Sequence, residues 1–239
     1  MAAEADEQMT ADRSKNGRDL DLAGLGQFAE AVIADVLDFF DVKGGGLLSH
    51  FLSDFLRRKA EEAREILLQE LRLGKVDELH AASKDEAFAI FFRYGRAIRD
   101  GTARRNLRLL ARTMVGLAKR DRLFADEFNK YAEMLERLSR DEILVIGRLH
   151  SHRKKHKPGQ GTAQYWPKFC DELVPSQFPN QEYLVAICCS AMRSGLVITP
   201  PDFASSGYYA TSPIMDEIAE LADFQEVLHA EGELAGHKK

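Results

Sequence analysis

The sequence predicts a mainly α-helical fold with one small β-hairpin near its C-terminal end. Apolar residues before position 140 recur every three or four residues, and no segment there alternates with a period of two. Two short β-type runs, 196–199 and 208–211, then flank a turn-rich segment, which is typical of a hairpin. With 239 residues, 45% apolar and 30% charged, the chain is long enough for one large or two modest domains.

The N-terminal part is predicted to hold a polar tail followed only by helices. Residues 1–20 carry many charges and few large apolar groups, so we expect a disordered acidic tail. Helical spacing across 21–138 predicts helices at about 22–40, 47–73, 84–99, 102–119 and 124–138. The second should bury one apolar stripe, formed by Leu52, Leu56, Ala60, Ala63 and Leu67, within the chain or against a second copy. Ser83 and Glu86 have the spacing of a capping box at the start of the third.

Capping residues predict the first elements of the C-terminal part. Ser139 and Glu142 have the spacing of a second capping box, which opens a helix that runs to about residue 153. A basic, glycine- and proline-containing loop is expected over 153–161. A short helix follows at about 167–173, and its proline suits the first turn.

The remaining elements end in a single helix and a short tail. Asn180 and Gly195 are placed to begin and end a helix over 181–194, ahead of the hairpin. Ser212 and the proline after it then start one last helix, expected to reach about residue 229. Residues 231–239 are expected to form a C-terminal tail.

The order helix, short helix, helix, hairpin, helix resembles a winged-helix domain over residues 139–230. The wording AMRSGLVITP…SGYYATSPIMDEIAEL is similar to the end of such domains, where a recognition helix runs into Gly-Leu and a Tyr-x-Leu-Thr strand precedes a closing helix. Ala210 stands where that family has leucine. The resemblance implies a helical region followed by a winged-helix-like domain with one small β-hairpin, and it implies nothing about function.

A second resemblance covers more of the chain. The arrangement NLRLLARTMVG…FNKYAEMLERLSRDEILVIGRL…SGLV…YYATSP is similar to the abortive-infection alpha family of bacterial helical proteins. In that family a helical region precedes similar Leu-rich and Tyr-x-x-Thr segments. The resemblance implies antiviral defence against phage, and it carries no catalytic residues over to this chain.

DNA binding is the usual function of a winged helix, yet the residues argue against the usual mode. Base readout needs Arg, Lys, Asn or Gln side chains that project into the groove. In the helix over 181–194 only Gln181 and Arg193 qualify, at opposite ends. No Lys or Arg lies between Arg193 and Lys238, so the wing offers no cation for phosphate. Nucleic acid is therefore expected as a weak partner at most.

Two basic clusters are the candidate anion or nucleic-acid contacts. Four arginines at 104–112 lie on one predicted helix, with 104, 108 and 112 four residues apart on one face. A second run extends from 148 to 157 and is expected to be a solvated loop. The candidate contacts are Arg104, Arg105, Arg108, Arg112, Arg153, Lys154, Lys155 and Lys157. The alternative for the arginine ridge is pairing with acidic helices of its own chain or of a second subunit.

The histidine, serine and cysteine residues of the sequence show no pattern typical of an enzyme. His150, His152 and His156 have spacings that could ligate a metal, but the cations between them oppose one, so we expect no metal and no cofactor. No Ser/His/Asp or Cys/His set has a recognisable spacing. The three cysteines lack disulfide and zinc spacings, and Cys188 and Cys189 are expected to be buried and inert.

Three functions stay open after this inspection. The first is a non-enzymatic, cytoplasmic regulatory protein that works by protein–protein interaction, with a protein partner or self-association. The second is a transcriptional regulator that binds nucleic acid through the Arg-rich helices. The third is an antiphage protein of the abortive-infection type. No stretch reaches the roughly 20 apolar residues of a membrane span, and the net charge of −5 does not favour an anionic partner.

Overall fold

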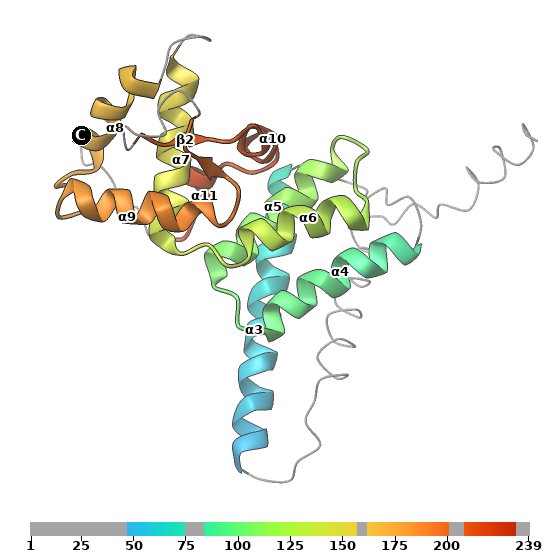
Figure 1. Ribbon diagram of the computed structural model, residues 1–239. Helices are drawn as coiled ribbons and strands as arrows, with labels where there is room; N and C mark the ends of the chain where they lie inside the picture. The colour runs from blue at the N-terminus through green and yellow to red at the C-terminus, as the bar shows by residue number, and fades with distance from the viewer. Residues whose placement is uncertain (1–46, 75–83, 157–161, 201–207, 233–239) are drawn as a thin grey trace, which may run out of the picture. The chain divides into compact units, whose positions relative to one another are not determined.

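The computed structural model describes residues 47–74, 84–156, 162–200 and 208–232 (Figure 1). Within these ranges the chain forms nine α-helices, one 3₁₀ turn and a single pair of two-residue strands. The predicted fold class, mainly α with one small hairpin, is therefore confirmed. The chain divides into two compact units, 1–132 and 133–239, whereas the sequence placed the boundary after 138. The predicted helix at 22–40 and the 1–20 tail lie outside the described residues.

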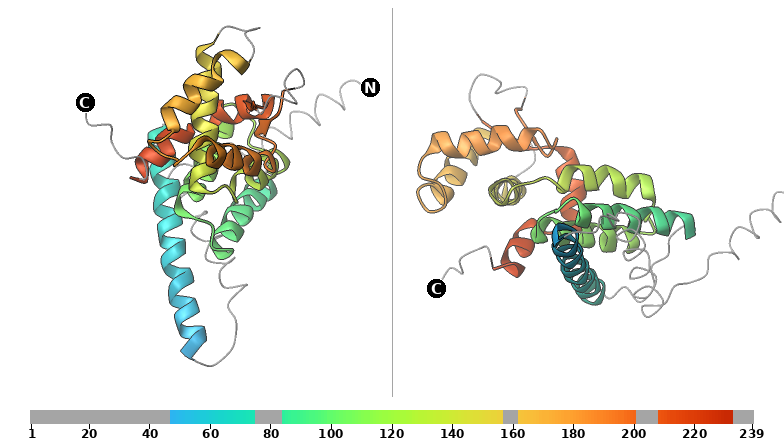
Figure 2. Two further views of the ribbon diagram at one scale, coloured as in Figure 1. Left: turned by 60° about the vertical axis from the view of Figure 1, so that its left-hand side comes forward. Right: turned by 90° about the horizontal axis from the view of Figure 1, so that it is seen from below.

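The N-terminal unit contains four helices that follow the predicted order. They are α3 (Leu47–Gly74), α4 (Lys84–Arg99), α5 (Arg104–Ala118) and α6 (Ala125–Leu135), which continues a short way into the second unit. α6 ends three residues before the predicted 138. α3 packs along α5 and also contacts α4 (Figure 1, Figure 2). α5 is buried on nearly every side, so it forms the centre of this unit.

The apolar stripe of α3 is buried only in its C-terminal half. Ala63, Leu67 and Leu71 are buried, whereas Leu56 and Ala60 are half-buried. Figure 1 and Figure 2 show the reason, because the first half of α3 extends beyond the end of α5. Within the chain the stripe is thus buried at Ala63 and Leu67 but only half-buried at Leu56 and Ala60, and the side chain of Leu52 lies outside the described ones. Tyr94 of α4 donates a hydrogen bond to the Ala63 carbonyl at 3.1 Å, which ties α4 to the buried half.

The C-terminal unit is assembled around one central helix, α7 (Arg140–Lys155). The other elements are a 3₁₀ turn (Thr162–Gln164), α8 (Trp166–Leu173), α9 (Gln181–Met192), β1 (Val197–Ile198), β2 (Ala210–Thr211), α10 (Pro213–Leu221) and α11 (Phe224–Ala230). α7 contacts α8, α9, β2 and α11, and α9 also packs on β1. The strands are antiparallel, with Val197 opposite Thr211 and Ile198 opposite Ala210.

The start and stop signals of this unit behave as predicted. The Ser139–Glu142 capping box is present with both of its hydrogen bonds, so α7 begins at Arg140. The Asn180 side chain accepts from Tyr183 N at 2.8 Å and caps α9. Gly195 follows α9 with a φ of +74°, a left-handed conformation that glycine adopts without a steric cost.

Two predictions about this unit are wrong. The segment 153–156 is not part of a solvated loop, because α7 continues to Lys155. Arg153 also forms an ion pair with Asp216 of α10. The single last helix is two helices, because the Asp223 side chain accepts from Gln225 N and Glu226 N and starts α11 anew. This second start places Phe224, Val227 and Leu228 in the core.

α11 lies close to α7 because Gly147 has no side chain. A Cβ added at Gly147 would lie 3.1 Å from Phe224 Cβ, tighter than most packing contacts, and 3.4 Å from Gln225 Cγ. On another side of the unit, Trp166 packs against Phe169 and Tyr209, with ring centroids 5.3 and 5.5 Å away. Across the described ranges no helix has the length and apolarity needed to cross a membrane.

Candidate protein-interaction surface

The arginine ridge of α5 lies against α3. Arg108 Nη1 is 2.6 Å from Glu70 Oε1, and the two side chains are only 3% and 4% exposed. Arg112 Nε binds the other oxygen of Glu70 at 2.9 Å. Arg104 Nη1 binds Glu62 Oε1 at 2.9 Å. Three of the candidate anion contacts therefore pair with carboxylates of their own chain.

Glu62 and Glu70 neutralise the ridge from one face of α3. Burial alone would raise the pKa of Glu62, but hydrogen bonds and positive charge from Lys59 and Arg104 outweigh it and hold that pKa below its usual value. Arg105, the fourth arginine of the predicted set, is half-buried on α5. An external phosphate at Arg108 would have to displace Glu70, so this ridge is occupied by the fold.

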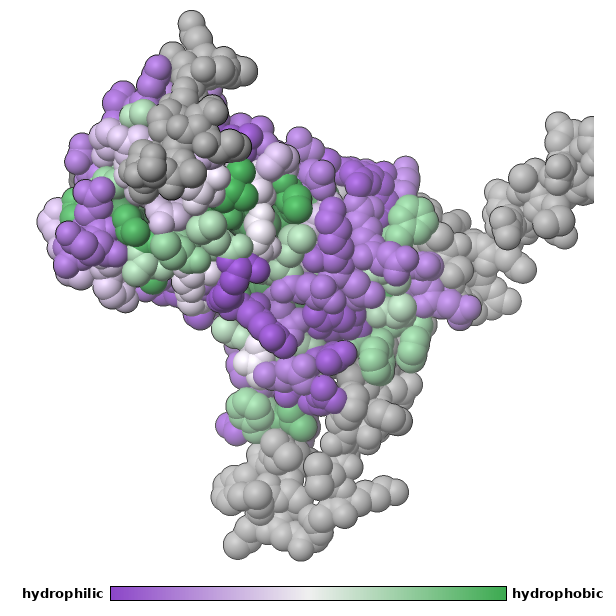
Figure 3. All heavy atoms as spheres, in the orientation of Figure 1, coloured by the Kyte–Doolittle hydropathy of each residue, from purple (hydrophilic) through white to green (hydrophobic). Residues whose placement is uncertain are grey.

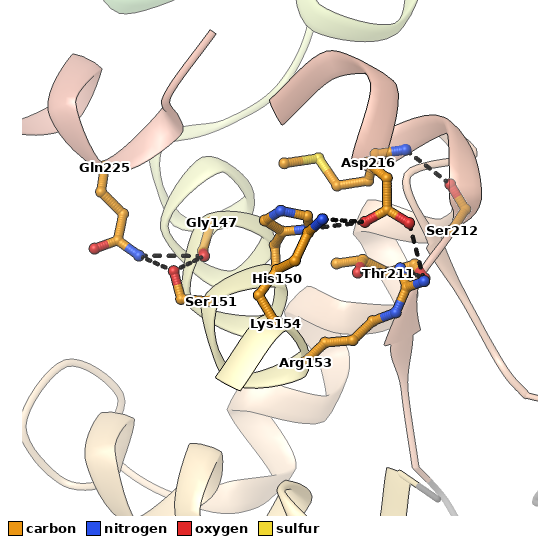
Figure 4. A network of polar contacts seen from close by, with 10 residues as sticks. Gly147, His150, Ser151, Arg153, Lys154, Thr211, Ser212, Asp216 and Gln225 are labelled. Atoms are coloured by element: carbon orange, nitrogen blue, oxygen red, sulfur yellow. Dashed lines mark hydrogen bonds and ion pairs between the residues drawn. The ribbon is translucent and has the colours of Figure 1, made fainter. Parts of the chain in front are cut away.

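The second basic cluster ties α7 to the hairpin and to α10 (Figure 4). Arg153 donates to the Thr211 carbonyl at 2.9 Å and to the Thr211 hydroxyl at 3.1 Å. Its other terminal nitrogen binds Asp216 at 2.9 Å, and Lys154 lies 4.0 Å from the same carboxylate. Lys155 is exposed, and Lys157 lies outside the described residues. Among the described residues of this cluster, Lys154 and Lys155 are the candidate anion contacts that are exposed.

The three histidines of the predicted metal spacing face different partners. His150 Nδ1 lies 3.6 Å from Asp216, and His152 Nε2 lies 2.6 Å from Glu172. His156 Nδ1 is 2.8 Å from the His152 carbonyl oxygen. In the described part of the chain no group of three or more metal-binding side chains comes together. The histidines act as contacts between α7 and its neighbours.

Acidification is expected to destabilise the C-terminal unit through His150. Burial lowers the pKa of His150 below its ordinary 6.5, with Lys154 and Arg153 acting in the same direction against Asp216 and Asp223. The unfolded chain then binds the proton more tightly, so stability is lost as the pH falls through 6.5. Trp166 fluorescence during urea unfolding, between about pH 7.5 and 5.5, measures this loss. His150→Asn should flatten the dependence, and an equally steep dependence in that variant would contradict it.

Glu142, in the first turn of α7, accepts hydrogen bonds from three residues. It is 1% exposed and accepts from Ser139 N at 2.7 Å, Ser190 Oγ at 2.7 Å and Arg193 Nη2 at 2.8 Å. Burial opposes its charge, but these bonds hold the pKa of Glu142 below its usual value. Arg193 Nη2 also donates to the Arg137 carbonyl at 3.0 Å. The one cation at the end of α9 is thus held by the fold.

α9 exposes four apolar residues, Tyr183, Ala186, Cys189 and Met192, beside the polar Gln181, Glu182, Ser190 and Arg193. Only Leu184, Cys188 and Ala191 of this helix are buried. Tyr183 is 46% exposed, Met192 39% and Ile198, at the adjoining strand β1, 36%. In Figure 3 the part of the surface where α9 lies is mixed, hydrophilic at its outer end and mostly pale green along the rest. Large apolar side chains at the surface mark a site of protein contact more often than one of phosphate contact.

The cysteines of α9 differ in their surroundings. Cys188 is buried, as predicted, and burial raises the pKa of its thiol. Cys189, which was also predicted to be buried, is exposed, and its Sγ lies 2.8 Å from Tyr209 Oη. That hydrogen bond, with burial, raises the pKa of Tyr209 to about 12.

Sequence reasoning missed that α9 presents large apolar side chains at the surface. Its signal was visible: apolar residues occupy most positions of α9 after Glu182, while only one side of a helix can face a single small core. Comparison with known protein families, curated proteins and solved structures gave no significant match. The assignment of function therefore rests on the residues themselves.

Proposed function

We propose that this chain is a non-enzymatic, cytoplasmic regulatory protein whose C-terminal unit is winged-helix-like and binds protein. The order of α7, α8, α9, the hairpin and α10, together with the sequence resemblance over 139–230, supports the winged-helix assignment. Three free cysteines suit a reducing compartment. The observation that carries the function is the exposure of large apolar side chains, Tyr183, Met192 and Ile198, on and beside α9, the helix in the recognition position.

Several contacts make base readout by this unit unfavourable. Arg193, at the end of α9, is bound to Glu142 and to the Arg137 carbonyl. Gln181 is the remaining side chain of α9 suited to reading a base. Nucleic-acid binding through α5 is the second candidate, and it would require Arg108 and Arg112 to leave Glu70. Lys154 and Lys155 support only weak contact with phosphates.

Photo-crosslinking in cells tests the proposed function directly. A photoreactive amino acid at position 183, on the exposed face of α9, should yield adducts with protein. The same amino acid at Glu217, which is exposed on α10, is the matched control and should yield far fewer. Nucleic-acid adducts at position 183, or equal yields at the two positions, would overturn the proposal.

DNA binding at physiological salt is expected to be weak or absent. Any binding at low salt should fall steeply as salt is added, because each neutralised phosphate releases counterions. It should also depend little on base sequence, since α9 offers few groups that read bases. Fluorescence anisotropy with unrelated duplexes at two salt concentrations measures both properties. Sequence-selective binding that survives physiological salt and disappears with Gln181→Ala would contradict the expectation.

A further inference from the structure

We infer that the first half of α3 is a docking surface for the N-terminal segment 22–40 of the same chain, which folds back on it as an antiparallel helix. This contact lies in the N-terminal unit and is independent of the function proposed for the C-terminal unit. Three observations support it: an apolar face of α3 that α5 does not cover, the short connection between the two segments, and their opposite charges.

The uncovered face belongs to residues 47–60, the half of α3 that extends beyond the end of α5 (Figure 1, Figure 2). Phe55 is 41% exposed, and Leu56 and Ala60 are half-buried, whereas Ala63 on the same stripe is buried. A helix of about 14 residues that projects alone into water is only marginally stable. The helical conformation of this half therefore calls for an apolar element beside it.

The segment 22–40 is the apolar element that directly precedes this face along the chain. Its apolar residues recur at helical spacing from Leu25 to Phe40, and residues 41–46 connect it to the first residue of α3. Three of these six connecting residues are glycines, which permit a reversal of direction. Helices joined by a short connection pack as antiparallel neighbours. The tether also holds the segment at a higher effective concentration than a second copy would reach.

The lengths of the two segments match across such a hairpin. Residues equally far from the connection face each other in an antiparallel pair. Val32 lies nine positions before residue 41, and Phe55 lies nine positions after residue 46. The middle of the apolar stripe of 22–40 thus faces the exposed Phe55. As a helix, 22–40 would be about 28 Å long, and the uncovered half of α3 is about 21 Å long, so the segment covers it completely.

The charges of the two segments are complementary. Segment 22–40 contains three acidic residues and no Lys or Arg, whereas the first half of α3 contains three Lys or Arg residues and one acidic residue. Glu30 lies eleven positions before residue 41, and Arg57 lies eleven positions after residue 46, so the hairpin places them at the same level. Arg57 is 71% exposed, which leaves its guanidinium accessible to a second carboxylate. A second copy of α3 would instead bring like charges together.

Disulfide formation in the full-length chain tests the contact and the face that it uses. Val32→Cys with Phe55→Cys, in a Cys189→Ser background, places two thiols at facing positions within disulfide reach. Diamide takes up two electrons and two protons as the thiols form a disulfide, and the expected product is an intramolecular bond in a monomer. Ala34→Cys with Phe55→Cys is the matched control. Position 34 lies on the opposite side of the predicted helix from Val32, so this pair should form far less disulfide.

Hydrogen exchange of the full-length chain measures how far the contact protects α3. Val32→Asp places a charge in the apolar contact, so the amides of 47–60 should exchange at least about tenfold faster than in the wild type. The amides of 61–74, which pack on α5, should keep their protection. Ala34→Asp adds the same charge on the other side of the segment and should leave the exchange of both ranges unchanged.

Three outcomes would overturn the inference. A covalent dimer in place of the intramolecular disulfide would assign the face to a second copy of the chain. Equal disulfide yields from positions 32 and 34, or none from either, would show that 22–40 does not bind through its apolar stripe. Equal exchange of 47–60 in Val32→Asp and Ala34→Asp would exclude this segment as the element that covers α3.

Discussion

Replacing Glu70 by leucine is expected to lower the free energy of unfolding of the N-terminal unit by about 3–5 kcal/mol. Glu70 is 4% exposed and binds Arg108, which is 3% exposed, at 2.6 Å, and Arg112 at 2.9 Å. Removal of the carboxylate takes away the charge that the buried guanidinium of Arg108 binds at 2.6 Å. An uncompensated charge in the core costs more than the ion pair itself contributed.

Two further variants separate this explanation from a general loss of packing. Glu62→Leu removes the partner of Arg104, in a pair whose side chains are 24% and 46% exposed, and should cost less than about 1 kcal/mol. The double variant Glu70→Leu/Arg108→Met should recover part of the lost stability, because the most buried pair of charges leaves the core together while Arg112, 14% exposed, still lacks Glu70.

Far-UV circular dichroism during denaturant unfolding gives the free energies, and hydrogen exchange in α3 and α5 localises them to the N-terminal unit. A Glu70→Leu variant as stable as Glu62→Leu would contradict the prediction. So would a double variant that is no more stable than Glu70→Leu alone.

The ion pairs between α3 and α5 could not be predicted from the sequence, because the sequence does not show which helices pack together. Glu62 and Glu70 are eight residues apart, as are Arg104 and Arg112, so both sets recur every two helical turns. The equal spacing of these acidic and basic residues can be seen in the sequence. Periodicity does not show, however, which helices pack against each other. Glu62 belongs to the polar side of the pattern in α3, yet its side chain is only 24% exposed. The alternative of internal pairing was open, and it is what the ridge residues do.

Local signals were predicted well because their physical cause is local. Ser139 and Glu142 lie three residues apart, and the two hydrogen bonds of a capping box depend only on that spacing. Glu86 shows the limit, because its carboxylate accepts from Ala125 N at the start of α6, a partner 39 residues away. Its predicted partner Ser83 lies outside the described residues.

The site residues were the hardest to predict because exposure depends on tertiary contacts. The basic end of α7 was assigned to a loop because its carboxylate partners, Glu172 and Asp216, are distant in the sequence. α9 was expected to bury both of its adjacent cysteines, yet Cys189 is exposed. The sequence identified both the basic residues of α7 and the cysteines of α9. Whether their side chains are exposed depends on contacts with elements that are distant in the sequence.

Glu142→Ala should lower the free energy of unfolding of the C-terminal unit by about 3 kcal/mol. The change removes the capping box of α7 and leaves the donors of Ser190 and Arg193 without this acceptor. Single deletions should cost less: Ser139→Ala removes the cap alone, at about 1 kcal/mol. Ser190→Ala removes one donor together with its need for a partner, so it should also cost about 1 kcal/mol.

Acid titration gives this prediction a signature that loss of packing would not produce. Because the pKa of Glu142 is held below its ordinary 4.5, the unfolded chain takes up the proton first. The stabilisation from Glu142 is therefore present above that value and is lost as the pH falls through the lower, folded-state pKa. Trp166, the only tryptophan and 2% exposed within this unit, reports unfolding by fluorescence. In Glu142→Gln this acid-dependent part should vanish, and a variant that keeps the wild-type slope would show that another carboxyl group causes it.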